Sequence, residues 1–138
     1  SSDLTRLPEE IEGPLGAAYC SLNELLERSD FVSVHLPMNE STRGLIDVDA
    51  FARMKDGAFL VNISRAPIVD RAALMDVLES DRLGGIALDV HYEEPSPPDD
   101  PLKNYPKALL TPHSAVAGRA NATADMEELI ANLAAGIG

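Results

Sequence analysis

The sequence has one cysteine, no tryptophan and few other aromatic residues, which together make up 4% of its 138 residues. A single thiol, Cys20, cannot form an internal disulfide, so a reducing, cytoplasmic setting is expected. No start typical of a secretory signal and no apolar run long enough to cross a bilayer is present. Only 11 Lys and Arg stand against 23 Asp and Glu, and the net charge of −12 repels a phosphate backbone. We therefore expect neither membrane insertion nor nucleic-acid binding, whereas a small molecule or a basic partner stays open.

The length and the overall balance of residues are those of one globular domain. With 45% hydrophobic and 25% charged residues, the chain is close to an average soluble domain and unlike a disordered one. Its 138 residues can bury one core but not two, so a complete two-domain enzyme is excluded.

Short apolar segments alternate regularly with segments of helical pattern. Three apolar segments are rich in β-branched residues, as in parallel strands that are covered on both faces. We expect these strands at 31–36, 58–63 and 85–90, and weaker strands at 17–20 and 108–110. The alternation predicts an α/β fold with a doubly wound parallel sheet, in which ligands bind at the carboxyl ends of the strands.

Helix starts are recognisable between these strands. Ser21 and Glu24 form a capping-box pattern, and Asp47 and Asp70 precede apolar residues at helical spacing. A last amphipathic helix is expected over 121–135. The stretch 92–106 carries five of the ten prolines and no apolar periodicity, which predicts a long surface loop of the kind that often carries function.

Chemically competent side chains follow the predicted strands. Arg65 follows the second strong strand, Glu93 and Glu94 the third, and His113 the weak last strand. A guanidinium can clamp a carboxylate, an imidazole can move a proton, and a carboxylate can orient that imidazole. Singly, Arg65 and the two glutamates are most simply solvated surface charges, and His91 is ambiguous. His113 differs, because Pro112 fixes the backbone before it at the end of an apolar strand. Only their joint placement at one end of the sheet favours acid–base chemistry on an anionic substrate.

Three segments, at 61–70, 87–95 and 110–115, carry a resemblance to a known family. They read VNISRAPIVD, ALDVHYEEP and LTPHSA, and in order and spacing they resemble motifs of the D-isomer-specific 2-hydroxyacid dehydrogenases. The segments at 29–37, 42–46 and 54–58 are similar to the stretches between those motifs. The resemblance implies a dinucleotide-binding domain of an NAD(P)-dependent oxidoreductase. Such an enzyme interconverts 2-keto acids and D-2-hydroxy acids, as glyoxylate and hydroxypyruvate reductases do.

The same resemblance implies a catalytic set of Arg65, Glu94 and His113. Arg65 would hold the substrate, His113 would donate a proton to the carbonyl oxygen as hydride arrives, and Glu94 would support the imidazolium. Glu94 is preferred to Glu93 because the catalytic carboxylate of the family directly precedes this proline. A Glu here also argues against the formate dehydrogenase branch, which has Gln.

Cofactor-binding positions are implied in the same way. Asp89 matches a position near the nicotinamide carboxamide, and Asp3 matches an acidic residue that binds the adenosine ribose. Asp3 favours NAD, while Arg6 leaves NADP open. The other implied positions are Leu36, Pro37, Ile63 and Ser64, together with Arg65 and His113. No metal site is predicted.

The G-x-G-x-x-G turn that receives the pyrophosphate in such domains is absent from the sequence. We therefore expect a partial Rossmann-like sheet that lacks the first strand and the glycine-rich loop. Residues 1–138 would form part of a dinucleotide-binding domain, with 118–138 a C-terminal helix that returns toward a substrate domain. The strand at 17–20 would then lack its neighbours, and the strand at 31–36 would lie at an exposed edge.

The expected protein is a piece of a longer, homodimeric dehydrogenase, or a chain whose missing strands another chain supplies. Alone it should have little or no activity, because the pyrophosphate site and the second domain are needed. Two other interpretations stay open: a non-catalytic, co-repressor-like binding protein on the same scaffold, and an interaction module that pairs with a separate chain. The joint presence of Arg65, Glu94 and His113 argues against the first. The substrate side chain cannot be deduced from the sequence.

Overall fold

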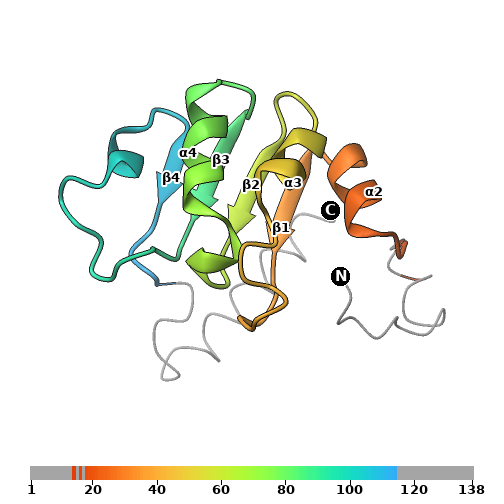
Figure 1. The fold of residues 1–138 in the computed structure, drawn as a ribbon, viewed down its shortest axis with the longest axis horizontal. Helices are drawn as coiled ribbons and strands as arrows, with labels where there is room; N and C mark the ends of the chain where they lie inside the picture. Colours follow the sequence, from red (N-terminus) through yellow and green to blue (C-terminus); the bar gives the residue numbers. More distant parts are fainter. Residues whose placement is uncertain (1–13, 15, 17, 115–138) are drawn as a thin grey trace, which may run out of the picture.

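The computed structural model describes residues 14, 16 and 18–114, and in this part four parallel strands form a single sheet (Figure 1). The strands are β1 (Phe31–Val34), β2 (Phe59–Asn62), β3 (Gly85–Leu88) and β4 (Ala108–Leu110), and they lie in the order β1-β2-β3-β4. Parallel neighbours need crossover connections, which here run through helices or the long 92–106 segment. The predicted α/β class with a parallel, Rossmann-like sheet is confirmed.

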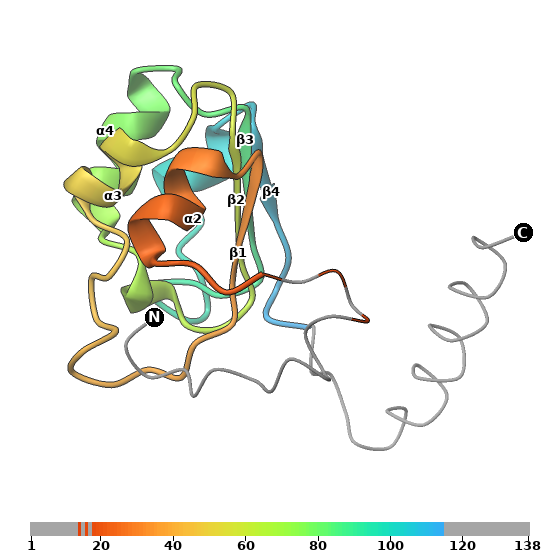
Figure 2. The same cartoon turned by 90° about the vertical axis from the view of Figure 1, so that its right-hand side faces the viewer.

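Three α-helices in the described residues cover one face of this sheet: α2 (Leu22–Arg28), α3 (Val48–Arg53) and α4 (Arg71–Glu79) (Figure 2). The predicted caps are confirmed, because Ser21, Asp47 and Asp70 each accept a hydrogen bond from the backbone N–H three residues further on. None of the helices in 18–114 is long and apolar enough to span a membrane. The helix predicted at 121–135 lies outside the described residues.

The core fills the space between the sheet and these helices. Alternate residues of the strands are buried with apolar residues of the helices, and they include Val32, Leu60, Ile86, Leu26, Phe51 and Leu74. Full burial of one such side chain stabilises the fold by roughly 1.5–3 kcal/mol. The core therefore fixes the position of the strand ends and of the loops that follow them.

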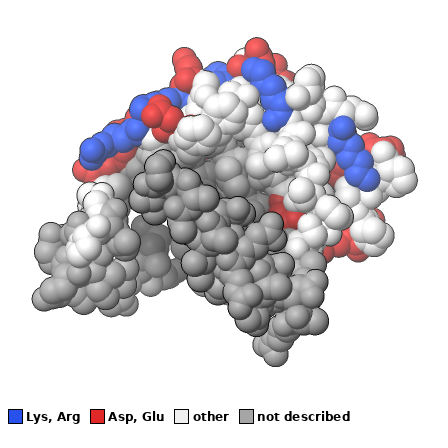
Figure 3. Space-filling view, turned by 180° about the vertical axis from the view of Figure 1, so that it is seen from behind, with Lys and Arg blue, Asp and Glu red and all other residues white. Residues whose placement is uncertain are grey.

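The opposite face of the sheet is apolar and exposed. Phe31, Phe59, Ile63 and Leu109 are 69%, 39%, 43% and 65% exposed, and the rings of Phe31 and Phe59 stack with centroids 5.0 Å apart. Seen from behind, the described part of this face has few charged atoms at its centre (Figure 3). The strand pattern predicts cover on both faces, and the described helices cover only one. β1 lies at the edge of the sheet, as expected.

The prediction of a strand at 17–20 is wrong. Residues 18–20 are irregular backbone that leads directly into the N-cap Ser21. A short apolar segment forms a strand only where a neighbour pairs with its backbone, and no strand in the described residues lies beyond β1. The strands β1, β2 and β3 are present but each is two residues shorter than predicted, and β4 has the predicted bounds.

The segment 92–106 is irregular apart from the short 3₁₀-helix η3 (Pro101–Asn104). As predicted, it lies mostly at the surface, and two buried residues, Asp100 and Leu102, anchor it. The carboxylate of Asp100, which is 4% exposed, accepts from Leu102 N–H and pairs with Arg71 at 3.3 Å. The hydroxyl of Tyr92 donates to the Val69 carbonyl at 2.9 Å, and burial raises the pKa of Tyr92. These contacts hold the segment against the start of α4.

Candidate active site

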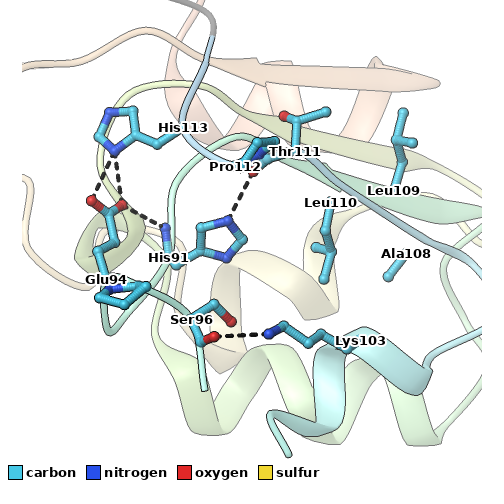
Figure 4. Close-up of a pocket in the computed structure, with 11 residues that line it drawn as sticks. His91, Glu94, Ser96, Lys103, Ala108, Leu109, Leu110, Thr111, Pro112 and His113 are labelled. Carbon is cyan, nitrogen blue, oxygen red and sulfur yellow. Dashed lines mark hydrogen bonds and ion pairs between the residues drawn. The ribbon is translucent and has the colours of Figure 1, made fainter. Parts of the chain in front are cut away.

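Glu94 and His113 form a hydrogen-bonded pair at the carboxyl rim, the edge of the sheet where β1–β4 end (Figure 4). His113 Nδ1 lies 2.8 Å from Oε1 and 2.9 Å from Oε2 of Glu94, and Oε1 also accepts from the backbone N–H of His91 at 3.2 Å. The hydrogen bond from His113, followed by that from His91, holds the pKa of Glu94 below its usual range. The carboxylate only accepts, so Nδ1 of His113 carries a proton, and no hydrogen bond from Nε2 to another group is found within 18–114.

The loop that carries His113 is held by the end of β3. Thr111 N–H donates to the Leu88 carbonyl at 3.0 Å. The Asp89 carboxylate, which belongs to a buried residue, accepts from the Thr111 hydroxyl at 2.5 Å and from Ser114 N–H at 2.9 Å. His113 has a φ of 55°, a conformation that a residue other than glycine keeps only where its surroundings impose it. Asp89 is thus part of the support of the His113 loop.

A buried amide shapes the turn that carries Arg65. Asn62, which is 0% exposed, donates through Nδ2 to the Arg65 carbonyl at 3.0 Å and accepts from Ser64 N–H at 3.0 Å. Ser64 Oγ donates to the Val34 carbonyl at 2.7 Å, which ties the turn to β1. Sequence reasoning missed Asn62 as a supporting residue, although an amide inside an apolar strand is the signal that could have revealed it.

Arg65 itself is exposed at this rim. Its guanidinium donates to the Ser64 carbonyl at 2.6 Å and pairs with no carboxylate of residues 18–114. Arg65 follows β2, whereas Glu94 and His113 follow β3 and β4, and no hydrogen bond or ion pair joins Arg65 to them within the described part. The structure therefore brings two of the three predicted catalytic residues into contact and leaves the third, a cation without a carboxylate partner in 18–114, on the same rim.

Two of the predicted cofactor positions, Ile63 and Asp89, line a common cavity at the carboxyl ends of β2–β4. The cavity has a volume of about 330 Å³, and its other lining residues are Ala87, Leu88, Leu109, Thr111 and Ser114. An apolar wall beside a carboxylate fits a planar ring that bears an amide, because the carboxylate accepts from the amide N–H. The residues present therefore fit the nicotinamide end of a dinucleotide.

The remaining predicted cofactor positions lie elsewhere. Leu36 lines a separate apolar cavity with Cys20 and Ile68. The Pro37 carbonyl accepts from the Thr42 hydroxyl at 2.8 Å, which closes the turn after β1. Asp3 lies outside the described residues.

A larger cavity of about 670 Å³ adjoins the Glu94–His113 pair (Figure 4). Lys103 lies on its far side and donates to the Ser96 carbonyl at 2.8 Å. The remaining lining residues are His91, Pro95, Ala108, Leu109, Leu110, Thr111 and Pro112. The pair is thus open to small molecules. No group of three or more His, Cys, Asp or Glu side chains in residues 18–114 could hold a metal ion.

The parallel sheet, the imidazole–carboxylate pair and the exposed guanidinium define a class: Rossmann-like domains that carry acid–base groups at the carboxyl ends of their strands. A family model described as "D-isomer specific 2-hydroxyacid dehydrogenase, NAD binding domain" matches residues 2–115. The chain belongs to this family, which confirms the resemblance seen in the sequence.

Relatives and solved structures agree with this assignment. The chain is 42% identical over 127 residues to a protein named glyoxylate reductase from Korarchaeum cryptofilum, covering 92% of this chain and 38% of that protein. It matches apo D-mandelate dehydrogenase of Rhodotorula graminis with a TM-score of 0.78 and 38% identity, covering 84% of this chain and 34% of that one. A D-isomer specific 2-hydroxyacid dehydrogenase from Xanthobacter autotrophicus, solved with NADPH, matches with a TM-score of 0.64 and 39% identity over 67% of this chain and 29% of that one. The chain thus spans well under half the length of these proteins.

Proposed function

We propose that the chain is the carboxyl-terminal part of the NAD-binding domain of an NAD(P)-dependent D-2-hydroxyacid dehydrogenase. The observation that carries the proposal is the Glu94–His113 pair, with Nδ1 and Oε1 2.8 Å apart at the carboxyl rim. The substrate would be a 2-keto acid of the glyoxylate or hydroxypyruvate kind, a choice supported by the printed name of the Korarchaeum relative.

In this proposal the residues of the chain divide the work of carbonyl reduction. The exposed guanidinium of Arg65 binds the substrate carboxylate and orients the adjacent carbonyl. His113 donates the proton on Nε2 to the carbonyl oxygen, and the Glu94 carboxylate offsets the positive charge of the imidazolium. The bound nicotinamide cofactor supplies the hydride. In the reverse direction the neutral His113 accepts the hydroxyl proton of the D-2-hydroxy acid.

The cofactor would lie along the carboxyl rim. Ile63 and Asp89 would hold the nicotinamide end in their common cavity, and Asp3 would bind the adenosine ribose. The further positions proposed to line the cofactor are Leu36, Pro37 and Ser64, with Arg65 and His113 beside the reacting atoms. NAD is the proposed cofactor and NADP the alternative, which the NADPH in the Xanthobacter structure supports.

The setting proposed for the whole protein is a homodimer in the cytoplasm, with a small acid as its partner rather than nucleic acid or membrane. The single cysteine supports a reducing compartment, and the net charge of −12 opposes contact with phosphate backbones. Residues 118–138 would form a helix that returns toward the substrate domain. Without a glycine-rich turn, the 138-residue chain alone should bind NADH weakly and turn over little substrate.

The test compares the 138-residue chain with a full-length protein that contains it. NADH is titrated into each while cofactor fluorescence is followed, and oxidation is then started with glyoxylate or hydroxypyruvate. Binding and turnover by the full-length protein only are expected. Tight NADH binding by the short chain would contradict the account of the missing phosphate turn.

Variants of the full-length protein then test the residues. His113→Ala and Arg65→Ala should each lower kcat/KM by about 10²–10⁴-fold. Lys107→Ala, which removes a cation from the opposite end of the sheet, is the matched control and should leave turnover unchanged. Normal turnover in both site variants would refute the catalytic assignment and favour a non-catalytic binding protein.

A further inference from the structure

His91 forms hydrogen bonds with Glu94 and with the loop that carries His113, although the mechanism gives it no part. Its backbone N–H donates to Glu94 Oε1 at 3.2 Å, and its Nε2 lies 2.8 Å from the carbonyl oxygen of Thr111. Thr111 is two residues before His113 in the loop after β4. Figure 4 shows the His91 ring between this loop and the segment that carries Glu94.

The contact of His91 with the Thr111 carbonyl determines which ring nitrogen of His91 carries a proton. A backbone carbonyl can only accept a hydrogen bond, so Nε2 of His91 must carry the proton that it shares with Thr111. His91 is therefore a side-chain donor that links the end of β3 to the loop after β4.

The carbonyl that receives this bond also accepts a hydrogen bond from the backbone of His113. The Thr111 carbonyl accepts from His113 N–H at 3.0 Å, and His113 has the positive φ of 55°. A backbone in this region relaxes unless its neighbours hold it. Asp89 holds the loop on one side through Thr111 Oγ1 and Ser114 N–H, and His91 holds it through the carbonyl.

We propose that His91 is a positioning residue, which sets the separation of Glu94 and His113 by holding the loop of each. Its backbone fixes the carboxylate and its imidazole fixes the carbonyl on which the His113 turn closes. The expected effect of His91 on catalysis rests on the proposed dehydrogenase activity. The hydrogen bonds by which His91 holds the loop do not depend on that activity. The ring is not a proton donor to substrate, because its Nε2–H is already committed to Thr111.

Two variants of the full-length protein separate the effect of the His91 hydrogen bond from the effect of the size of the ring. His91→Phe keeps a planar ring of similar size and removes the donor, whereas His91→Gln keeps a side-chain N–H. We expect the Phe variant to lower kcat about tenfold, with KM for the keto acid and for NADH unchanged, because a small displacement of a catalytic group costs rate rather than ground-state binding. The Gln variant should recover most of the loss.

The second measurement is solvent exchange of backbone amides by NMR, which needs no activity. In the Phe variant the amides of His113 and Ser114 should exchange about tenfold faster, while the amide of Leu60 in β2 keeps its rate. Unchanged exchange at His113 and Ser114 would overturn the proposal. If the Phe variant loosens β2 as well, the Gln variant decides: exchange like that of the unmodified protein supports the proposal, and loosened exchange overturns it.

These measurements separate the failure of this inference from that of the proposed function. A protein that reduces no keto acid refutes the dehydrogenase assignment, and the exchange rates still decide whether His91 holds the loop. An active protein whose kcat and exchange rates are both unaffected by His91→Phe refutes the role of His91 alone.

Discussion

The two rims of the sheet carry charges that are partnered in different ways. At the amino-terminal rim, where β1–β4 begin, cations pair with nearby carboxylates: Lys55 with Asp30 at 2.9 Å, Arg82 with Asp56 at 2.8 Å and Lys107 with Asp81 at 2.6 Å. Figure 3 shows acidic and basic atoms side by side along one edge of the molecule. At the carboxyl rim, Arg65 has no carboxylate partner in 18–114, and Glu94 is paired with an imidazole.

The ion pairs at the amino-terminal rim neutralise one another, whereas the groups at the carboxyl rim are those that the proposed function assigns to a ligand. Exposed ion pairs contribute little stability, because water already solvates both partners. Groups at a binding rim are instead held by buried polar residues, here Asn62 and Asp89, while their own functional atoms stay open. The amino-terminal rim should therefore tolerate substitution, and the carboxyl rim should not.

Among the variants that compare the two rims, the largest effect is expected for Glu94→Gln in the full-length protein. The neutral amide cannot offset the charge of the His113 imidazolium, so kcat/KM for the keto acid should fall about a hundredfold. Steady-state oxidation of NADH measures this. Asp81→Asn at the amino-terminal rim is the matched removal of one carboxylate charge, and it should leave the rate unchanged. Equal effects of the two variants would abolish the contrast between the rims.

The same pair should respond to acid. Its hydrogen bonds lower the pKa of Glu94 from 4.5, so the stabilisation from this pair is complete above that value and is lost as pH falls through the lower folded-state pKa. A ¹³C NMR titration of the Glu94 carboxyl should therefore show a midpoint below 4.5. His113→Ala removes the main cause of the shift and should move the midpoint upward. If the midpoint of the Glu94 titration does not change in His113→Ala, the pairing of Glu94 with His113 is contradicted.

A smaller effect, on stability, is expected at the anchor of the segment that carries Glu94. Asp100→Ala leaves Arg71 without its partner and Leu102 N–H without its acceptor, and it should lower the free energy of unfolding by about 2 kcal/mol. Asp100→Asn keeps an oxygen for Leu102 and should cost less. Urea unfolding measures both values. If Asp100→Asn lowers the free energy of unfolding as much as Asp100→Ala does, the whole loss comes from the ion pair with Arg71.

The smallest effect is expected at the amino-terminal rim. Lys55→Met breaks the pair with Asp30, whose side chain is 77% exposed. The free energy of unfolding should change by less than about 1 kcal/mol, and the activity of the full-length protein should stay the same. Thermal and urea unfolding check the first expectation. A larger loss in the free energy of unfolding would mean that the two rims differ less in their tolerance to substitution than their geometry indicates.

Local patterns predicted what is locally determined. The caps at Ser21, Asp47 and Asp70 lie three residues from the backbone groups that they bind, so the sequence carries the whole signal. The apolar segments at 31–36, 58–63 and 85–90 predict strands correctly because each is long enough to be buried. The segment at 17–20 has a similar but weaker pattern, and it fails because a strand also needs a neighbour.

The site was predictable only in part for the same reason. Strand ends indicate which residues share a rim, and the resemblance distinguished Glu94 from Glu93. The role of His91 depends on a carbonyl 20 positions away, and that of Asn62 on the way one turn folds back on itself. Neither contact has a local pattern. Asp89, predicted only as a cofactor neighbour, also supports the His113 loop through contacts of this kind.

The exposed apolar face has a thermodynamic consequence. Phe31 and Leu109 are 69% and 65% exposed in the folded chain and Phe59 is 39% exposed, so unfolding exposes less new apolar surface there than in a sheet covered on both sides. The heat capacity change of unfolding scales with that surface. A partner or a further segment that covers this face would increase the heat capacity change of unfolding. Calorimetry of the chain, alone and with whatever completes it, would therefore measure the covering of the sheet directly as an increase in the heat capacity change.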